Sequence, residues 1–389
     1  MKATIQRRAI AAALALAAAA GVATGALAAD LKVGLSVSLS GPNSSLGVPY
    51  AKGMQAALAY KPEIAGRKVT LIVLDDASDP SNAGRNARKL VEEEKVDILM
   101  GSSGVPATIA ISQVGRESRT PMVGLSPISL PPAESEWIVT VAQPPTLMIE
   151  AIVQRMKRDG VKTVGYIGFS DAWGDLVYGS LTKAAEPAGI KVVTNERYAR
   201  ADTSVTGQVL KIVAARPDAV MTGGSGTPGA LPYLALAERG FKGGVYGQHG
   251  LINPDFVRVA GASANGTIMP TGPVIVAEQL PADYPTKKIA LDFRTAFQKV
   301  NSAPSTDAFS AYSFDAYLVF ADAAARVIAA KGEPGTAAFR TALRDAIFAT
   351  KEVVGTHGVY NFKPGSLYGV DERARVIVKV DNGQWKLVP

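Results

Sequence analysis

The sequence predicts an α/β fold made of two doubly wound parallel-sheet lobes. Short apolar runs rich in Val and Ile recur along the chain, and each is followed by a segment with helical character. Strands buried on both faces of a parallel sheet are apolar throughout, and their alternation with helices is typical of α/β layers. Because the runs form two series separated near residues 140–145, we expect two such lobes.

The individual elements follow from these patterns. The first series of predicted strands covers residues 31–39, 69–74, 96–100 and 122–125, and the second covers residues 163–169, 190–193, 219–222 and 244–246. Between the strands we expect helices, such as one over residues 82–94 that begins after the capping sequence Asp79-Pro80-Ser81. In another segment, Val205, Val209 and Ile212 fall on one apolar helical face.

The C-terminal third departs from this alternation. Three helices are expected over residues 284–301, 309–330 and 336–349, followed by short strands over residues 358–362 and 375–380 and a tight turn at Asn382-Gly383. Segments that return after both sheets are built indicate a chain that crosses between the lobes more than once. We therefore assign residues 29–142 and 276–350 to the first lobe, and residues 143–275 and 351–389 to the second.

Residues 1–28 are predicted to be a cleaved secretory signal. A positive start (Lys2, Arg7, Arg8) precedes an Ala- and Leu-rich run, and Ala26-Leu27-Ala28 gives the small-x-small pattern of a cleavage site. The run is too short and too interrupted for a membrane anchor. With no cysteine in the sequence, lipidation is also excluded, so we expect a freely diffusing periplasmic protein.

Composition also limits the classes of function. Three of the basic residues belong to the signal, so the excess of positive charge falls from +7 to +4, and no basic stripe suggests nucleic-acid binding. The chain has two histidines, His249 and His357, and lacks both a Gly-x-Ser-x-Gly elbow and a His-Glu-x-x-His motif. We therefore expect no enzyme activity, no cofactor and no metal.

Small polar residues follow several predicted strands at their carboxyl ends. They occupy residues 40–47, 101–104 and 126–129, each before a helix. Ligands of open α/β sheets bind at this edge, and helix N-termini there favour negative charge. The first lobe is therefore predicted to hold a carboxylate. The Gly-rich stretch 223–229, with Gly224 and Ser225, either presents backbone N–H groups to a ligand or simply turns the chain from strand to helix.

Several motifs, in this order and spacing, resemble the type I periplasmic binding proteins of the leucine/isoleucine/valine-binding family. The motifs are Ser38-Leu39-Ser40-Gly41-Pro42, Asp75-Asp76 with Asp79-Pro80, Gly101-Ser102-Ser103-Gly104, Thr120-Pro121-Met122, Tyr166-Ile167-Gly168-Phe169, Asp171-Ala172-Trp173-Gly174, Arg216-Pro217-Asp218-Ala219-Val220 and Gly247-Gln248-His249-Gly250. The resemblance covers nearly all of the mature chain. It implies two lobes joined by a three-strand hinge, a ligand in the cleft between them, and docking on an inner-membrane ABC permease.

The resemblance also implies roles for particular residues. The ligand carboxylate is expected at two loops of the first lobe, and Trp173 is expected to cover the ligand from the second. The predicted ligand-binding residues are Ser102, Ser103, Gly104, Val105, Ser126, Ile128, Ser129, Trp173, Gly224, Ser225 and His249. Phe309, Tyr312 and Tyr317 are expected to pack their own helix instead.

One position departs from the family pattern. Amino-acid binders carry a Glu in the loop matching residues 247–250, where it holds the ligand's ammonium group, and this chain has His249. An imidazole is a poor partner for ammonium but can donate a hydrogen bond to an oxygen. The sequence therefore predicts a monomeric binding protein for a small carboxylate, with an aromatic or other apolar acid favoured. A branched-chain amino-acid binder and a ligand-sensing receptor domain of the same fold remain alternatives.

Overall fold

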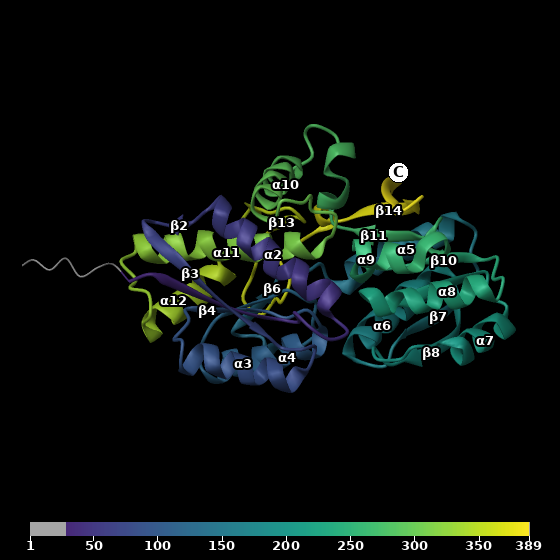
Figure 1. The fold of residues 1–389 in the computed structure, drawn as a ribbon, viewed down its shortest axis with the longest axis horizontal. Coiled ribbons are helices and arrows are strands. Elements are labelled where there is room, and N and C mark those ends of the chain that lie inside the picture. The colour runs from purple at the N-terminus through teal and green to yellow at the C-terminus, as the bar shows by residue number, and fades with distance from the viewer. Residues whose placement is uncertain (1–28, 389) are drawn as a thin grey trace, which may run out of the picture.

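The first of two sheets forms the centre of one lobe in the computed structural model, which describes residues 29–388 (Figure 1). Its strand order is β2-β3-β1-β4-β5-β6, and all neighbours pair in parallel except β2 and β3. The strands are β1 (Leu31–Val37), β2 (Glu63–Ile64), β3 (Arg67–Asp75), β4 (Ile98–Gly101), β5 (Met122–Gly124) and β6 (Ile138–Thr140). Helices α2 (Ser44–Tyr60), α3 (Pro80–Glu92) and α4 (Val105–Glu117) connect them.

The second sheet has the order β15-β14-β11-β10-β9-β7-β8, in which the five strands from β11 to β8 are parallel. The strands are β7 (Thr163–Phe169), β8 (Lys191–Tyr198), β9 (Ala219–Gly223), β10 (Gly244–Tyr246), β11 (Ile268–Thr271), β14 (Val376–Asp381) and β15 (Gln384–Val388). The helices of this lobe are α5 (Pro145–Arg158), α6 (Ala172–Ala188), α7 (Thr206–Ala215), α8 (Leu231–Glu238) and α9 (Pro254–Ala260). The predicted fold class, two parallel α/β lobes, is confirmed.

Three later helices return to the first lobe: α10 (Lys287–Asn301), α11 (Phe309–Ala329) and α12 (Ala337–Phe348). Helix α11 lies against α2, and their backbones approach so closely that a Cβ atom at Gly53 would lie 1.9 Å from the carbonyl oxygen of Ser310. A residue larger than glycine at position 53 would therefore push the helices apart. Buried apolar side chains such as Met54 and Phe314 fill the space around this contact.

Three segments connect the lobes, and they meet near the base of the cleft. The amide of Gln143 in the first segment donates to the carbonyl oxygen of Ala374 at 3.0 Å and lies 3.4 Å from Nδ1 of His357 in the third. Gly272 in the second segment packs on that imidazole, since a Cβ there would lie 1.8 Å from Nδ1. From α11, Tyr312 donates its hydroxyl to Gln143 Oε1 and stacks on the ring of His357, with ring centroids 3.8 Å apart.

Some elements differ from the sequence-based expectation. Strands β6 and β11 were not predicted, although they are as long as β5 and β4, which were; β11 contains Pro270, a residue that argues against a strand in the sequence. The strand expected over residues 358–362 is only β13 (Val359–Tyr360), which pairs with β12 (Val353–Val354) outside both large sheets. Strand β8 continues to Tyr198 as an edge strand, and its polar second half hid this continuation from a search for apolar runs.

Two predictions concern the chain ends and the membrane. The predicted signal, residues 1–28, lies outside the described residues. Across residues 29–388, every helix is too short or too polar to span a bilayer. The residue boundaries assigned to the lobes stay a prediction, although β14 and β15 join the second sheet and α10 to α12 lie with the first lobe.

Candidate ligand-binding site

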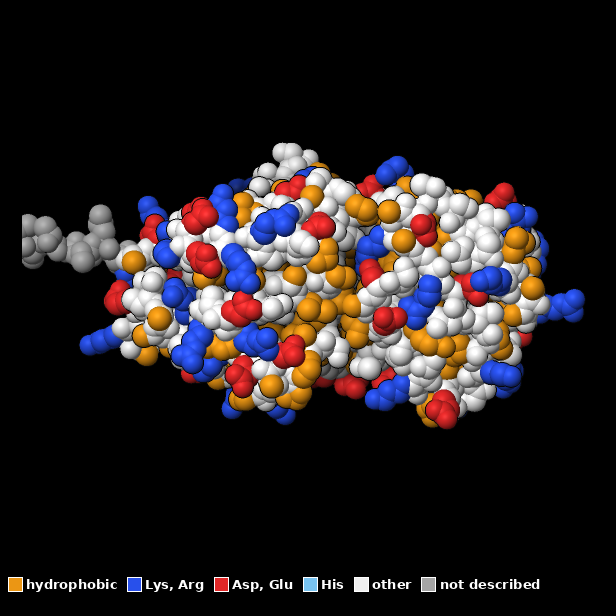
Figure 2. Space-filling model, turned by 90° about the horizontal axis from the view of Figure 1, so that it is seen from below, with side chains coloured by type: hydrophobic (Ala, Val, Ile, Leu, Met, Phe, Trp, Pro, Cys, Tyr) orange, Lys and Arg blue, Asp and Glu red, His pale blue; other side chains and the backbone are white. Residues whose placement is uncertain are grey.

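A cavity lies between the lobes, with about 380 Å³ of space free of protein atoms that includes its opening to solvent. Both lobes contribute to its wall, which is mainly apolar and aromatic. The lining residues are Leu46, Tyr50, Ser103, Gly104, Val105, Leu125, Ser126, Pro127, Ala142, Trp173, Arg200, Ser225, His249, Gly250, Phe309 and Tyr312. Figure 2 shows hydrophobic side chains gathered on one face where the two lobes meet.

The loop between β4 and α4 brings hydrogen-bond donors to the cavity. Gly104 is the N-cap of α4, and no side chain of the described residues caps this helix, so the N–H groups of Val105 and Ala107 remain available, while Pro106 between them has none. The hydroxyl oxygen of Ser103 accepts a hydrogen bond from the backbone N–H of Ser38 at 2.9 Å, which leaves the hydroxyl hydrogen for another acceptor. A helix N-terminus with free donors attracts an anion.

The loop between β4 and α4 is anchored by hydrogen bonds to Asp76, on the side away from the cavity. Its carboxylate accepts hydrogen bonds from the hydroxyl of Ser102 and, at 2.6 Å, from the hydroxyl of Ser38. Burial raises the pKa of Asp76 while these hydrogen bonds oppose the rise. Ser126 adds a further link by donating to the carbonyl oxygen of Ser102 at 2.8 Å. The donors of the loop are thus positioned before any ligand arrives.

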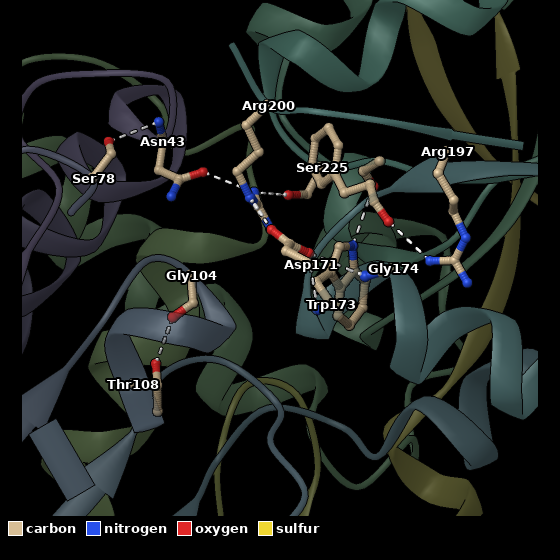
Figure 3. A network of polar contacts seen from close by, with 12 residues as sticks. Asn43, Ser78, Gly104, Thr108, Asp171, Trp173, Gly174, Arg197, Arg200 and Ser225 are labelled. Atoms are coloured by element: carbon tan, nitrogen blue, oxygen red, sulfur yellow. Dashed lines mark hydrogen bonds and ion pairs between the residues drawn. The ribbon is translucent and has the colours of Figure 1, made fainter. Parts of the chain in front are cut away.

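Trp173 enters the cavity from the first turn of α6. Asp171 caps this helix, since its Oδ1 accepts from the backbone N–H of Trp173 at 3.0 Å and of Gly174 at 3.2 Å (Figure 3). The indole N–H donates to the carbonyl oxygen of Gly224 at 3.4 Å, and the ring is 4% exposed. The backbone therefore fixes the edge of the indole, and its apolar surface faces the cavity.

His249 has an unusual environment. It is 3% exposed, and neither ring nitrogen has a hydrogen-bond partner among the described residues. Burial lowers the pKa of His249 to about 3, so the ring is neutral at pH 7 and carries one donor and one acceptor. The edge-to-face contact with Trp173, at 5.5 Å between centroids, orients the ring. Buried polar atoms are normally paired, so the two unpaired nitrogens make His249 a candidate ligand contact.

Arg200 is a site residue that sequence reasoning missed. It follows β8, and its guanidinium donates to Asp171 Oδ2 at 2.6 Å and to the hydroxyl oxygen of Ser225 at 3.0 Å. The guanidinium also lies over the ring of Phe169, 4.2 Å from its centroid. Ligands of parallel sheets bind at the carboxyl ends of the strands. Had β8 been predicted to end at Tyr198, Arg200 would have been recognised as a residue at that end.

The predicted residues divide into two groups. The wall of the cavity contains Ser103, Gly104, Val105, Ser126, Trp173, Ser225 and His249. The other four lie outside that wall: Ser102, Ile128, Ser129 and Gly224.

Each of the four has a physical reason for its place. Ser102 and Gly224 lie behind the wall, where the Ser102 hydroxyl bonds Asp76 and the Gly224 carbonyl accepts from Trp173. The loop after β5 turns away beyond Pro127, so that the carbonyl of Ile128 accepts from the hydroxyl of Tyr368 at 2.7 Å. Ser129 is exposed.

The aromatic residues of α11 also differ from expectation. Phe309 and Tyr312 were expected to pack their own helix, and both line the cavity. The helix is buried on nearly all sides, so its apolar spacing could not show which face meets the cavity. Tyr317 does pack within the first lobe, where its hydroxyl donates to the carbonyl oxygen of Lys61 at 2.6 Å.

Solved structures resemble this chain over nearly its whole length. An extracellular ligand-binding receptor from Rhodopseudomonas palustris HaA2 is 42% identical, with a TM-score of 0.89, over 93% of this chain and 100% of that one. An ABC-transporter solute-binding protein from R. palustris in complex with benzoate is 20% identical, with a TM-score of 0.78, over 92% of this chain and 96% of that one. The second likeness is one of fold alone.

Sequence comparisons identify the family. The chain is 25% identical over 248 residues to Leu/Ile/Val-binding protein homolog 3 of Brucella melitensis, which covers 62% of this chain and 67% of the relative. The predicted resemblance to the leucine/isoleucine/valine-binding proteins is confirmed. A family model described as periplasmic binding protein matches residues 30–362, and the chain therefore belongs to the periplasmic binding protein family.

Proposed function

We propose that this protein is the substrate-binding component of an ABC importer and captures a small carboxylate, with an aromatic acid favoured, between its two lobes. The lack of an acid in the cavity wall carries the proposal. Among the described residues that line the cavity, none is an acid, and the one charged side chain, Arg200, is paired with Asp171 at 2.6 Å. Such a wall favours an anion over a zwitterion, because an ammonium group removed from water needs a counter-charge.

Hydrogen-bond donors from both lobes support a carboxylate at the junction of the lobes. The free N–H groups of α4 and the hydroxyl of Ser103 come from the first lobe. The neutral ring of His249 comes from the second and offers an N–H donor to a carboxylate oxygen. These groups donate hydrogen bonds without bringing a second full negative charge.

The remaining wall suits an apolar body. Tyr50 and Phe309 are in edge-to-face contact at 5.5 Å on the first lobe, and Tyr312 lies beside them. Trp173 faces them from the second lobe. Aromatic rings packed in this way add about 0.5–1.5 kcal/mol per pair beyond their buried area, which favours an aromatic ligand.

A branched-chain amino acid is the second candidate, and the name of the Brucella relative favours it. Three acids of the second lobe, Asp171, Asp175 and Glu238, do not supply a partner for its ammonium group. Asp171 is paired with Arg200, and Asp175 lies 3.0 Å from Arg197. Glu238 is exposed on α8 and does not line the cavity.

Calorimetry with matched ligands tests the proposal. Benzoate and phenylpyruvate are expected to bind at least about 100-fold more tightly than phenylalanine and leucine, because only the amino acids must bury an unpartnered ammonium group. Phenylpyruvate and phenylalanine share a body, so their comparison isolates the α-substituent. Tight binding of leucine or phenylalanine with no response to either acid would restore the amino-acid candidate.

We further propose export to the periplasm as a monomer that is not lipidated. The charged start, the apolar run and Ala26-Leu27-Ala28 support cleavage before Ala29. Intact-mass measurement of the exported protein is expected to give the mass of a chain that begins at Ala29. A mass that includes residues 1–28 or a lipid would contradict this. Docking on a receptor instead of a permease would make the same binding domain a sensor.

A further inference from the structure

The two lobes touch directly across the cleft through the N-terminal turn of α2. Nη1 of Arg200, in the second lobe, donates to Oδ1 of Asn43, in the first, at 2.9 Å (Figure 3). Next to this contact, the backbone N–H of Thr227 donates to the hydroxyl oxygen of Ser45 at 3.1 Å. The lobes approach closely here, since a Cβ on Gly226 would lie 2.7 Å from that oxygen.

Besides the bond to Asn43, Arg200 is held by three residues of its own lobe. Asp171 and Ser225 bind its guanidinium from two sides, and the ring of Phe169 supports it from a third. None of these partners belongs to the first lobe. The guanidinium is therefore aimed at Asn43 without requiring a ligand to position it.

The first lobe holds the backbone of Asn43. Its backbone N–H donates to the hydroxyl oxygen of Ser78 at 3.0 Å, and its carbonyl accepts from the N–H groups of Leu46 and Gly47. Its side chain makes no cap bond to α2, so the amide oxygen is available to the other lobe. Asn43 is not among the residues that line the cavity.

From this geometry we propose that Asn43 and Arg200 form a latch that keeps a fraction of the unliganded protein closed. Asn43 is then a positioning residue, which sets the population of the binding-competent state without touching the ligand. A charge-assisted hydrogen bond between preorganised partners shifts such an equilibrium by about tenfold. Apparent affinity falls with the competent fraction, so the latch tunes the affinity for any ligand.

Distances between labels on the two lobes test the latch directly. The chain has no cysteine, so Lys89→Cys on α3 and Lys183→Cys on α6 give two unique attachment sites for fluorophores. Both lysines are exposed and lie on opposite lobes. Single-molecule energy transfer on the unliganded protein is expected to show a closed and an open population. The variant Asn43→Ala should lower the closed-to-open ratio about tenfold.

Two further variants separate the latch from a general loss of structure. Asn195→Ala removes a similar bond, from Nε of Arg197 at 2.7 Å, which lies within the second lobe, and its closed fraction should match the wild type. Asn43→Asp keeps an acceptor for Arg200 and should retain the closed population. An unchanged ratio in Asn43→Ala, or a wild type that is entirely open without ligand, would overturn the proposal. Because no ligand is added, the result does not depend on the proposed function.

Discussion

The variant His249→Glu is expected to bind benzoate at least about 100-fold more weakly than the wild type, because two carboxylates would share a cavity from which water is largely excluded. His249 is fully buried and neutral, so the substitution adds a full negative charge where none stands now. Arg200 cannot offset this charge fully, because Asp171 already neutralises it at 2.6 Å. Calorimetry on both proteins measures the difference.

A matched variant separates charge from shape at this position. His249→Gln keeps one donor and one acceptor without charge, and its affinity for benzoate should stay within about tenfold of the wild type. His249→Glu should at the same time gain affinity for phenylalanine, whose ammonium group would find a partner. Equal benzoate affinities in the Glu and Gln variants would show that His249 does not face the carboxylate.

Acid is expected to destabilise the unliganded protein through its two buried histidines. Burial lowers the pKa of His249 and of His357 to about 3, whereas an unfolded chain titrates near 6.5. Between pH 6.5 and 3 the unfolded state binds protons that the folded state excludes, so stability falls as the pH falls through this window. At pH 5 each histidine removes about 2 kcal/mol of the free energy of unfolding relative to pH 7.

Buried acids with a raised pKa stabilise the folded protein as the pH falls, which opposes the effect of the histidines. The test therefore compares the wild type with a variant that lacks His249. Burial raises the pKa of Asp315 to about 6, and its protonation in the folded state below that pH returns part of the loss. His249→Gln leaves this contribution unchanged. Urea unfolding at pH 7 and pH 5 should therefore show a loss in His249→Gln that is about 2 kcal/mol smaller than in the wild type. The same loss in both proteins would contradict a neutral, buried His249.

The sequence predicted best those strands and loops whose residue types depend on their immediate neighbours in the chain and not on packing against distant elements. Apolar runs located the central strands, and small residues after β4 marked a loop that does line the cavity. Arg200 was missed because edge strand β8 is polar in its second half, so that its carboxyl end was not recognised. Phe309 and Tyr312 were missed because α11 is buried on almost every face, and only its packing in the fold, above all against α2, determines which face lines the cavity.

The position of Tyr312 constrains attempts to redesign this protein as an optical biosensor. Its ring lines the cavity, while its hydroxyl and its stacking on His357 reach two of the segments that connect the lobes. A substitution made there to admit a new analyte would also disturb the contacts to Gln143 and His357, so recognition and any closure of the lobes that a sensor reports would change together. Phe309 lines the same cavity without such a link to the connecting segments. Selectivity is therefore better engineered at Phe309, with Tyr312 left intact to preserve the response.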